Sequence, residues 1–316
     1  MRYALGKLGT FLVTMFLVSA LTFVAFAVIP GDPATAKLGT EATPEQLEAL
    51  RQEMGLNEPL PVRYLKWVAG FFSGDLGTSY KYNTPVGELL GPKLRVTLAL
   101  SLMSFFLIVV IALPVGLFAA GVENKTVLAI GSAVNQLLMA VPPFFTGIIL
   151  TWVFSLTLHL FIHGDFPSMD SNLPGALHYL FYAAVAIAIP RIAMTVRMMK
   201  STADGEEKKD YVRTVYSKGA SKSLVMAGHI LKNAVPPIVS FLAQTLAEII
   251  AASIVVEQVF AIPGLGRFLV SSISGRDYPV VEAIVVIIAF WVVLAGTLAD
   301  LINLAIDPRL RKGDKR

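Results

Sequence analysis

The chain alternates between long apolar stretches without Asp, Glu, Lys or Arg and shorter polar segments. About 20 apolar residues cross a bilayer as a helix, and six stretches reach or approach that length. Glu248 interrupts the fifth and Asp300 the sixth. The pattern predicts an all-α, polytopic membrane protein with six transmembrane helices, at residues 8–31, 96–122, 126–164, 171–190, 233–256 and 283–306.

The third stretch, 126–164, is too long for one straight crossing. As a single helix it would extend about 60 Å, at a rise of about 1.5 Å per residue. Pro142-Pro143 divides it, and proline kinks or breaks a helix because it removes a backbone donor and clashes with the preceding turn. We expect residues 143–163 to form most of the crossing and residues 126–141 to enter obliquely.

The composition agrees with a membrane protein, since 55% of the residues are hydrophobic and 15% are charged. A soluble domain carries about 25% charged residues, so a soluble globular enzyme is excluded, as is intrinsic disorder. The net charge of +4 is too small to indicate a nucleic-acid partner. Without Cys, the chain has no disulfide, no Cys-ligated zinc and no thiol nucleophile.

The basic residues predict the orientation. If the N-terminus is cytoplasmic, 17 of the 26 Lys and Arg lie on the cytoplasmic side, most of them in 191–232 and 309–316. The positive-inside rule then places both termini in the cytoplasm. Arg2, Lys7 and the Ala25-Phe26-Ala27 segment also resemble a secretory signal. The apolar run is longer than a signal core, which favours a helix that is retained.

Four regions follow from this pattern: the N-terminus with the first helix (1–30), an extracytoplasmic loop with short helices (31–95), a core of five helices (96–306) and a cytoplasmic tail (307–316). In the outer loop, Thr43 and Pro44 predict the start of a short helix that ends at Met54-Gly55. Aromatic residues further along indicate an element docked on the membrane surface: Trp67, Phe71 and Phe72.

A charged segment at 198–235, inside the core region, predicts a cytoplasmic helical hairpin. Asp204 is expected to cap a helix that runs through Tyr216. Gly219 can take a positive φ in the turn, and Ser221 is placed to cap a second helix. That helix is expected to reach Asn233, before Pro236-Pro237 opens the fifth span. An ordinary charged hairpin is the alternative, and a membrane anchor argues against DNA recognition.

Eight short motifs occur in order along the chain. They are Pro-Gly-Asp-Pro (30–33), Met-Gly-Leu-Asn-Glu-Pro-Leu-Pro (54–61), Gly-Asp-Leu-Gly-Thr-Ser (74–79), Tyr-Val-Arg-Thr-Val-Tyr-Ser-Lys-Gly-Ala-Ser (211–221), His-Ile-Leu-Lys-Asn-Ala-Val-Pro-Pro (229–237), Glu-Gln-Val-Phe-Ala-Ile-Pro-Gly-Leu-Gly-Arg (257–267), Arg-Asp-Tyr-Pro-Val-Val (276–281) and Asp-Pro-Arg-Leu-Arg (307–311). Together they make the chain resemble, over essentially its whole length, the integral-membrane permease subunits of the dipeptide, oligopeptide and nickel branch of ABC importers.

The resemblance implies the type I ABC importer permease (MetI-like) architecture, with the hairpin seated in a groove of an ATPase. Counted back from Gly219, Arg213-Thr214-Val215 stands where the general permease signature has Glu-Ala-Ala. This departure leaves open which contact Arg213 makes. The residues that the resemblance assigns to ATPase coupling are Arg213, Thr214, Val215, Lys218, Gly219, Ala220 and Ser221.

The resemblance also implies partners in the bacterial inner membrane. A second homologous permease, expected as a heterodimer, would form the path with this chain, an extracytoplasmic binding protein would deliver substrate, and two cytoplasmic ATPase subunits would hydrolyse ATP. The cargo would be di- or oligopeptides, with nickel or a metal chelate as the alternative. The chain has no Walker A motif, so we expect no enzyme activity, no cofactor and no metal in this subunit.

Other functions are less well supported by the sequence. A secondary transporter would use intramembrane ionisable relays and inverted repeats, and a membrane hydrolase would need a nucleophile motif; neither pattern occurs. His159 and His163 are four residues apart and could share a metal on one helix face. No acid lies between them as in a His-Glu-x-x-His motif, which favours a water-facing pair.

Two further sites follow from individual residues. Glu248 lies in the middle of the fifth span, where a charge costs roughly 2.5–3.5 kcal/mol. With Gln244 on the same helix face, it either lines the translocation path and selects a cationic group or helps to pack two helices. A tight turn at the outer mouth is the second site, with Gly264 and Gly266 allowing close backbone turns. Its predicted gate residues are Glu257, Phe260, Pro263 and Gly264.

Overall fold

The computed structural model describes residues 2–28, 32–39 and 42–306. Regular structure in these residues is helical, apart from one isolated bridge between Thr78 and Pro85. Five helical segments are long and apolar enough to cross a membrane, and a sixth span results if the bent pair Lys125–Ala140 and Pro143–Thr157 counts as one. The predicted all-α, polytopic fold is therefore confirmed. The five segments are Gly6–Val28, Val86–Gly121, Leu173–Glu207, Lys222–Val259 and Tyr278–Ile302.

The chain forms two compact units. Unit 1 combines Met1–Thr97 with Pro263–Val293, and unit 2 combines Leu98–Ile262 with Leu294–Arg316. These units are defined by packing rather than by the side of the membrane, so the four topological regions inferred from the sequence stay a prediction. Pro30, Gly31 and the tail 307–316, with its Asp-Pro-Arg-Leu-Arg motif, lie outside the described residues.

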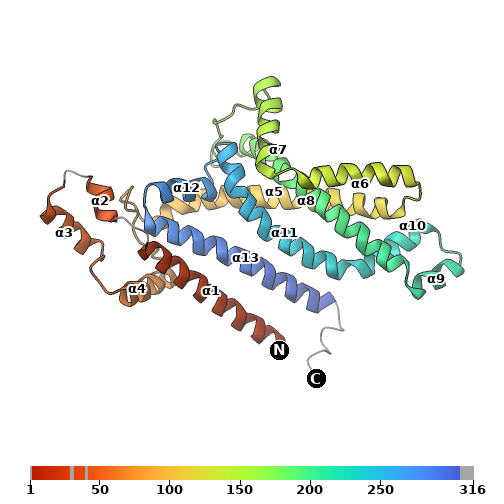
Figure 1. Cartoon of the computed structure of the whole chain (residues 1–316), viewed down its shortest axis with the longest axis horizontal. Coiled ribbons are helices and arrows are strands. Elements are labelled where there is room, and N and C mark those ends of the chain that lie inside the picture. Colours follow the sequence, from red (N-terminus) through yellow and green to blue (C-terminus); the bar gives the residue numbers. More distant parts are fainter. Residues whose placement is uncertain (1, 29–31, 40–41, 307–316) are drawn as a thin grey trace. The chain divides into compact units, whose positions relative to one another are not determined.

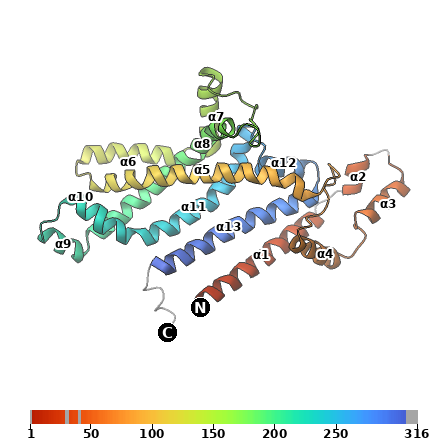
Figure 2. The same cartoon turned by 180° about the vertical axis from the view of Figure 1, so that it is seen from behind.

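Unit 1 is built around α1 (Arg2–Val28) and the first part of α13 (Tyr278–Ile306), which lie side by side in Figure 1 and Figure 2. Phe11 and Phe290 join them edge to face, with ring centroids 5.8 Å apart. Tyr64 ties α4 to α1, since its hydroxyl lies 2.8 Å from Ser19 Oγ. The remaining helical parts of the unit are α2 (Pro33–Leu38), α3 (Pro44–Glu53), α4 (Leu60–Ser73), the beginning of α5 (Val86–Gly121) and α12 (Leu265–Ser274).

Two sequence predictions for this unit hold. Thr43 makes a full capping box with Gln46 at the start of α3, and the helix ends at Glu53 with Gly55 at a φ of 65°. Trp67 is also docked on the protein, because its ring packs against Phe23 of α1 with the centroids 6.3 Å apart. The expected position of this element on the membrane surface stays a prediction. Phe72 is 85% exposed, so it presents an apolar surface outward.

Unit 2 is organised around α8 (Leu173–Glu207), which packs against α6, α7 and α11 (Figure 2). Close approach depends on small residues: a Cβ on Gly116 would lie 2.6 Å from Met199 Cβ. The other elements are the later part of α5 (Val86–Gly121), α6 (Lys125–Ala140), α7 (Pro143–Leu150), a π-helical turn (Thr151–Thr157), α9 (Asp210–Ser217), α10 (Lys222–Leu224), a second π-helical turn (Val225–Ile230) and α11 (Leu231–Val259).

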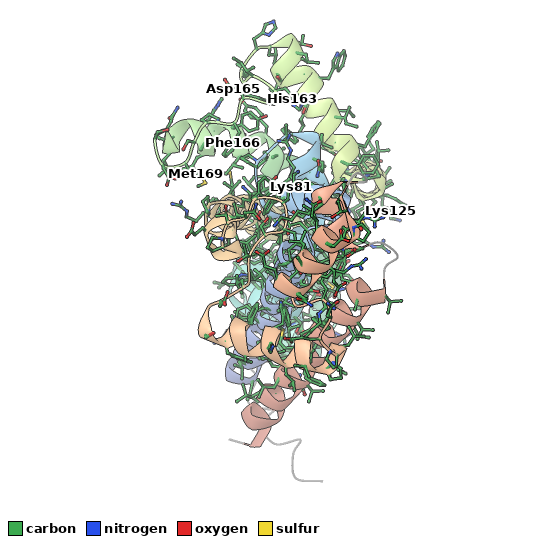
Figure 3. The ribbon with its side chains drawn as sticks, turned by 90° about the vertical axis from the view of Figure 1, so that its left-hand side faces the viewer. Lys81, Lys125, His163, Asp165, Phe166 and Met169 are labelled. Carbon is green, nitrogen blue, oxygen red and sulfur yellow. The ribbon has the colours of Figure 1, made fainter. Side chains whose placement is uncertain are left out.

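The third apolar stretch breaks where its prolines predict. Helices α6 and α7 meet at 94° around Pro142. The crossing is shorter than expected, however, because helical structure ends at Thr157 and His159 takes a φ of 52°. His159 and His163 therefore do not share a helix face, which corrects the geometry considered for a metal pair. Figure 3 shows His163 with Asp165, Phe166 and Met169 on the connection that leads to α8.

The predicted helix boundaries around the hairpin were wrong. Asp204 does not begin a helix: it lies inside α8 and pairs with Lys200. The break comes at Lys208-Lys209 instead. Pro236-Pro237 lies inside α11 rather than at its start. Charged residues do not end a helix that continues from a membrane into water, and spanning helices tolerate proline because neighbouring groups satisfy the freed backbone.

Candidate functional site

The hairpin between α8 and α11 is anchored by one buried side chain. Val212 of α9 is 1% exposed and lies in an apolar core with Ala120, Ala203, Val225, Met226 and Ile230. Gly219 then turns the chain with a φ of 82°, and Ser221 begins α10. The predicted glycine turn and the start of the second helix at Ser221 are confirmed, although the Ser221 hydroxyl makes no capping hydrogen bond.

Polar contacts fix α9 against both neighbouring helices. The Tyr211 hydroxyl donates to Glu206 Oε2 over 3.0 Å, and Asn233 Nδ2 donates to the Tyr211 oxygen over 3.1 Å. Lys209 also pairs with Glu206. Burial raises the pKa of Tyr211, so its phenol stays protonated as a donor. These bonds connect the end of α8, α9 and α11 into one frame that can transmit a displacement.

The predicted coupling residues divide into two groups by exposure. Val215 and Ala220 are partly buried against the hairpin core. The others form an outward-facing surface that a partner could contact: Arg213, Thr214, Lys218, Gly219 and Ser221 are exposed.

Glu248 of α11 is not an isolated charge. Its carboxylate forms an ion pair with Arg191 of α8, and Gln244 Nε2 donates to its other oxygen over 3.2 Å. The Arg191 and Glu248 side chains are 20% and 35% exposed. Gln244, Ala251 and Val255 on the same helix are exposed, so Glu248 lies beside an open face of α11. The geometry fits both interpretations drawn from the sequence, a path-lining acid and a packing contact.

The predicted gate segment is a helix cap. Ala261 has a φ of 54°, its N–H donates to Gln258 O, and the N–H of Ile262 donates to Glu257 O over 2.9 Å. These bonds form a Schellman motif at the end of α11. Glycine is the usual residue at the left-handed position of this motif, yet here alanine occupies it.

The roles expected of Gly264 and Gly266 in the turn are therefore corrected. Gly264 takes an extended conformation as the N-cap of α12, with a φ of −95°, and Gly266 lies within that helix. The chain turns at Ala261 because the cap bonds at the end of α11 require a positive φ there.

Two of the predicted gate residues, Glu257 and Phe260, lie at the end of α11 and are fully buried. The Tyr179 hydroxyl donates to the Phe260 carbonyl over 2.6 Å, and Phe161 stacks on Phe260 at 6.1 Å. Gly164 N donates to the same Tyr179 oxygen over 3.1 Å. This arrangement holds the end of α11 to α8 and to the connection before it.

Two family models together cover most of the chain. The "Binding-protein-dependent transport system inner membrane component" family matches residues 112–312, and its N-terminal companion, "Binding-prot-dependent transport system membrane comp, N-term", matches residues 1–101. The chain belongs to this family. It is thus a multi-pass membrane component, or permease, of a bacterial inner-membrane transport system that depends on a binding protein.

Relatives of this permease match it over nearly its full length. A probable peptide ABC transporter permease protein of Sinorhizobium fredii is 33% identical over 98% of this chain and 99% of its own. A putative peptide transport system permease protein of Brucella abortus is 34% identical, with 94% and 95% covered. The oligopeptide transport system permease protein AppB of Bacillus subtilis is 33% identical, with 93% and 94% covered.

A solved structure supports the fold of the permease. The MetNI methionine ABC transporter, in an inward-facing conformation, contains a chain that matches with a TM-score of 0.56 at 20% identity. The match covers 67% of this permease and 94% of that chain. The MetI-like architecture implied by the sequence motifs is thereby confirmed.

Sequence reasoning missed Arg191 as a site residue of the permease. It ended the fourth span at Pro190, so Arg191 was counted as the first cytoplasmic charge, whereas α8 continues to Glu207. One signal was available. Because a charge inside a membrane is expected to pair with another, Glu248 called for a basic partner on a neighbouring span, and Arg191 lies at the end of one.

Proposed function

We propose that this permease is the membrane subunit of an ATP-driven importer that carries di- or oligopeptides. The observation that carries the peptide assignment is the match, over more than nine-tenths of both chains, to permeases named for peptide or oligopeptide transport. Nickel or a metal chelate, the alternative from the sequence, is named in none of these three relatives. Transport rather than catalysis is the role of this subunit, and ATP hydrolysis belongs to separate partners.

The hairpin supports the coupling part of this proposal. Its exposed surface, with Arg213, Thr214 and Lys218, would seat on a cytoplasmic ATPase subunit. Val212 and the Tyr211 hydrogen bonds would pass the motion of that subunit to α8 and α11. The excess of Lys and Arg in the hairpin and the tail supports a cytoplasmic position for the hairpin and for both termini. Two ATPase subunits and an extracytoplasmic binding protein complete the importer.

The exposed face of α11 supports the path. Gln244 and Glu248 would line the route of the cargo, and the neighbouring Ala251 leaves room beside them. The path would close against a second, homologous permease, which makes the membrane part a heterodimer. The segment with Glu257, Phe260, Pro263 and Gly264 would bound the path at its outer end.

Reconstitution tests the function directly. Both permeases and the ATPases are reconstituted in proteoliposomes, and the binding protein is added. Uptake of labelled tri-alanine is measured with and without ATP on the side of the membrane that the ATPases face. We expect accumulation only with ATP and binding protein present. Uptake driven by a proton or sodium gradient without ATP would instead indicate a secondary transporter. Uptake of Ni²⁺ in place of tri-alanine would reassign the cargo.

A further inference from the structure

Unit 1 contains a cavity of about 590 Å³, within the range of roughly 300–1,000 Å³ typical of small-molecule sites. A smaller chamber of about 90 Å³ shares four of its lining residues. Those four come from α1, α4, the loop before α5 and α13: Phe23, Arg63, Tyr80 and Glu282. The larger cavity also has Trp67 in its wall.

Glu282 is the unusual residue of this cavity. Glu282 is 8% exposed. Among the described residues, none donates a hydrogen bond to its carboxyl group or forms an ion pair with it. Asp277, five residues earlier, is a buried acid with a structural role and serves as a comparison. It is fully buried and accepts hydrogen bonds from Ser79 Oγ and from Tyr80 N, the latter over 2.9 Å. A buried carboxylate is costly unless it is paired. The positive charge of Arg63 acts on Glu282, but no group of the described residues donates a hydrogen bond to this carboxyl, so it is open to a donor from a ligand.

The surroundings of Glu282 repeat this lack of partners. Tyr278 lies one helical turn before it on the same face of α13, lines the smaller chamber, and has a buried hydroxyl without a hydrogen-bond partner. The Arg63 guanidinium lies over the Phe23 ring at 5.8 Å. Its charge acts on Glu282 from a distance, without a direct ion pair. Burial, together with the nearby Glu282 carboxyl, raises the pKa of Tyr80 to about 12, so that phenol stays neutral.

These groups define the chemistry of a ligand. A carboxylate and a phenol oxygen in a small chamber both favour a compact cation with several N–H donors, which describes a primary ammonium group. Aromatic rings line the same space, and they attract ammonium groups through cation–π interactions. Arg63 lines both spaces, and on the side of the larger cavity it provides a positive charge for an anionic group of the same ligand. A peptide with free termini carries both charges.

We propose that this cavity receives the free amino end of an incoming peptide, with Glu282 as the counter-ion of its ammonium group and Tyr278 Oη as a second acceptor. The inference rests on the proposed function and deepens it, because it gives the permease its own site for the substrate, separate from the binding protein. An N-acetylated peptide lacks the charge that Glu282 needs, so the cavity distinguishes peptides with free and blocked amino ends.

The test uses the assembled permease–ATPase complex in nanodiscs, without binding protein. Calorimetry measures binding of tri-alanine and of N-acetyl-tri-alanine. We expect the wild-type complex to bind tri-alanine about tenfold more tightly than N-acetyl-tri-alanine. This is a modest difference in affinity for one charge-assisted contact. Glu282→Gln should abolish this difference by weakening tri-alanine alone, and Tyr278→Phe should weaken it less. Glu88→Gln is the matched control, since it removes an exposed carboxylate from the same unit and should change nothing.

Three results of the peptide-binding measurements would overturn the site. They are equal affinity of the wild type for the two peptides, no binding of either peptide, and an equal loss of affinity for both peptides in Glu282→Gln. The first comparison uses wild-type protein, so it does not depend on how a variant folds. If Glu282→Gln leaves tri-alanine binding intact but weakens capture of the binding protein, the ammonium group comes from a lysine of that protein and the proposal fails. The proposed function is tested separately, in the reconstitution assay. It fails if the wild-type importer shows no ATP-dependent uptake.

Discussion

Arg191 and Glu248 bring opposite charges together within the spanning helices of unit 2. One guanidinium nitrogen of Arg191 pairs with the Glu248 carboxylate. The Nε of the same guanidinium is buried and has no hydrogen-bond partner. Removing one member of a fully buried ion pair costs about 3–5 kcal/mol because the other charge is stranded, whereas replacing both members is often neutral. The side chains of this pair are 20% and 35% exposed, so we expect a smaller cost of the same sign. The pair therefore predicts a sharp difference between single and double substitutions.

We expect Glu248→Gln and Arg191→Gln each to lower the thermal stability of the purified complex, and the double variant to recover most of the loss. Peptide uptake by the double variant separates the two roles left open for Glu248. If the pair only packs helices, uptake recovers together with stability. If Glu248 lines the path, uptake stays low although the complex is stable. Equal stability of all four proteins would contradict the ion pair itself.

Ala261 holds a left-handed conformation that disfavours every residue with a Cβ, by roughly 1–2 kcal/mol. Ala261→Gly should therefore stabilise the protein by about 1 kcal/mol. Ala251→Gly is the matched control, because it makes the same exchange at an exposed position inside α11, where glycine costs about 1 kcal/mol. Thermal unfolding of the two variants should shift in opposite directions. A loss of stability in both would show that the cap is not strained.

Short-range chemistry explains which residue-scale predictions succeeded. The capping box at Thr43 needs only residues within one helical turn, so its sequence signal is sufficient. The left-handed residue in the turn after α11 was expected among the glycines at 264 and 266 and lies instead at Ala261. Its position is set by the hydrogen bonds of Gln258 and Glu257, which depend on where the helix ends. The ion pair of Glu248 depends on a residue 57 positions away in sequence and on the crossing of two helices.

The hairpin of α9 and α10 connects α8 to α11, and it is the element that we propose to meet the ATPase. Gly219 has a φ of 82° with open space around its α-carbon, so a substitution there acts through the backbone alone. Proline cannot adopt this φ. We expect Gly219→Pro to leave the permease in the membrane while it uncouples ATP hydrolysis from uptake, and Gly219→Ala to do so more weakly.

Gly164 offers the matched control for this element. Its φ of 85° and empty surroundings are the same, but it lies on the connection before α8. Gly164→Ala should carry the same backbone strain without uncoupling. The measurement is the ratio of peptides taken up per ATP hydrolysed in proteoliposomes. Normal coupling in Gly219→Pro would remove the hairpin from the mechanism, and similar uncoupling in both alanine variants would reduce its role to stability.

At the scale of elements, hydrophobic length predicts which segments are helices better than it predicts where they end. The apolar run at 171–190 identified α8, yet the helix continues through Arg191 and the charged residues up to Glu207. Backbone hydrogen bonding continues once a helix is established, because propagation is easier than nucleation. After the break at Lys208-Lys209, α9 buries Val212 in the hairpin core, a long-range contact that no local pattern reveals.

Transport requires the whole molecule to alternate between states, and each state must expose different residues to each side of the membrane. The comparison with an inward-facing transporter chain concerns the fold alone, so the conformational cycle has to be tested in this chain. The sequence identified the segment after α11 as a gate from its Pro and Gly content. The structure adds that Ile262, Gly264 and Gly266 are buried, whereas Pro263 is exposed.

Cysteine labelling measures that cycle directly, because the chain has no cysteine of its own. We expect Ile262→Cys and Gly266→Cys to react slowly with an impermeant maleimide in the resting importer, since both positions are buried. If the segment moves as a gate, their reaction rates change when ATP and the substrate-loaded binding protein are added. Ser274→Cys at the exposed end of α12 is the control, and its rate should be the same in both conditions. Unchanged slow labelling at 262 and 266 during active transport would mean that the Schellman motif and its tyrosine contact form a fixed corner. The moving gate would then have to be sought elsewhere, first along the exposed face of α11 beside Glu248.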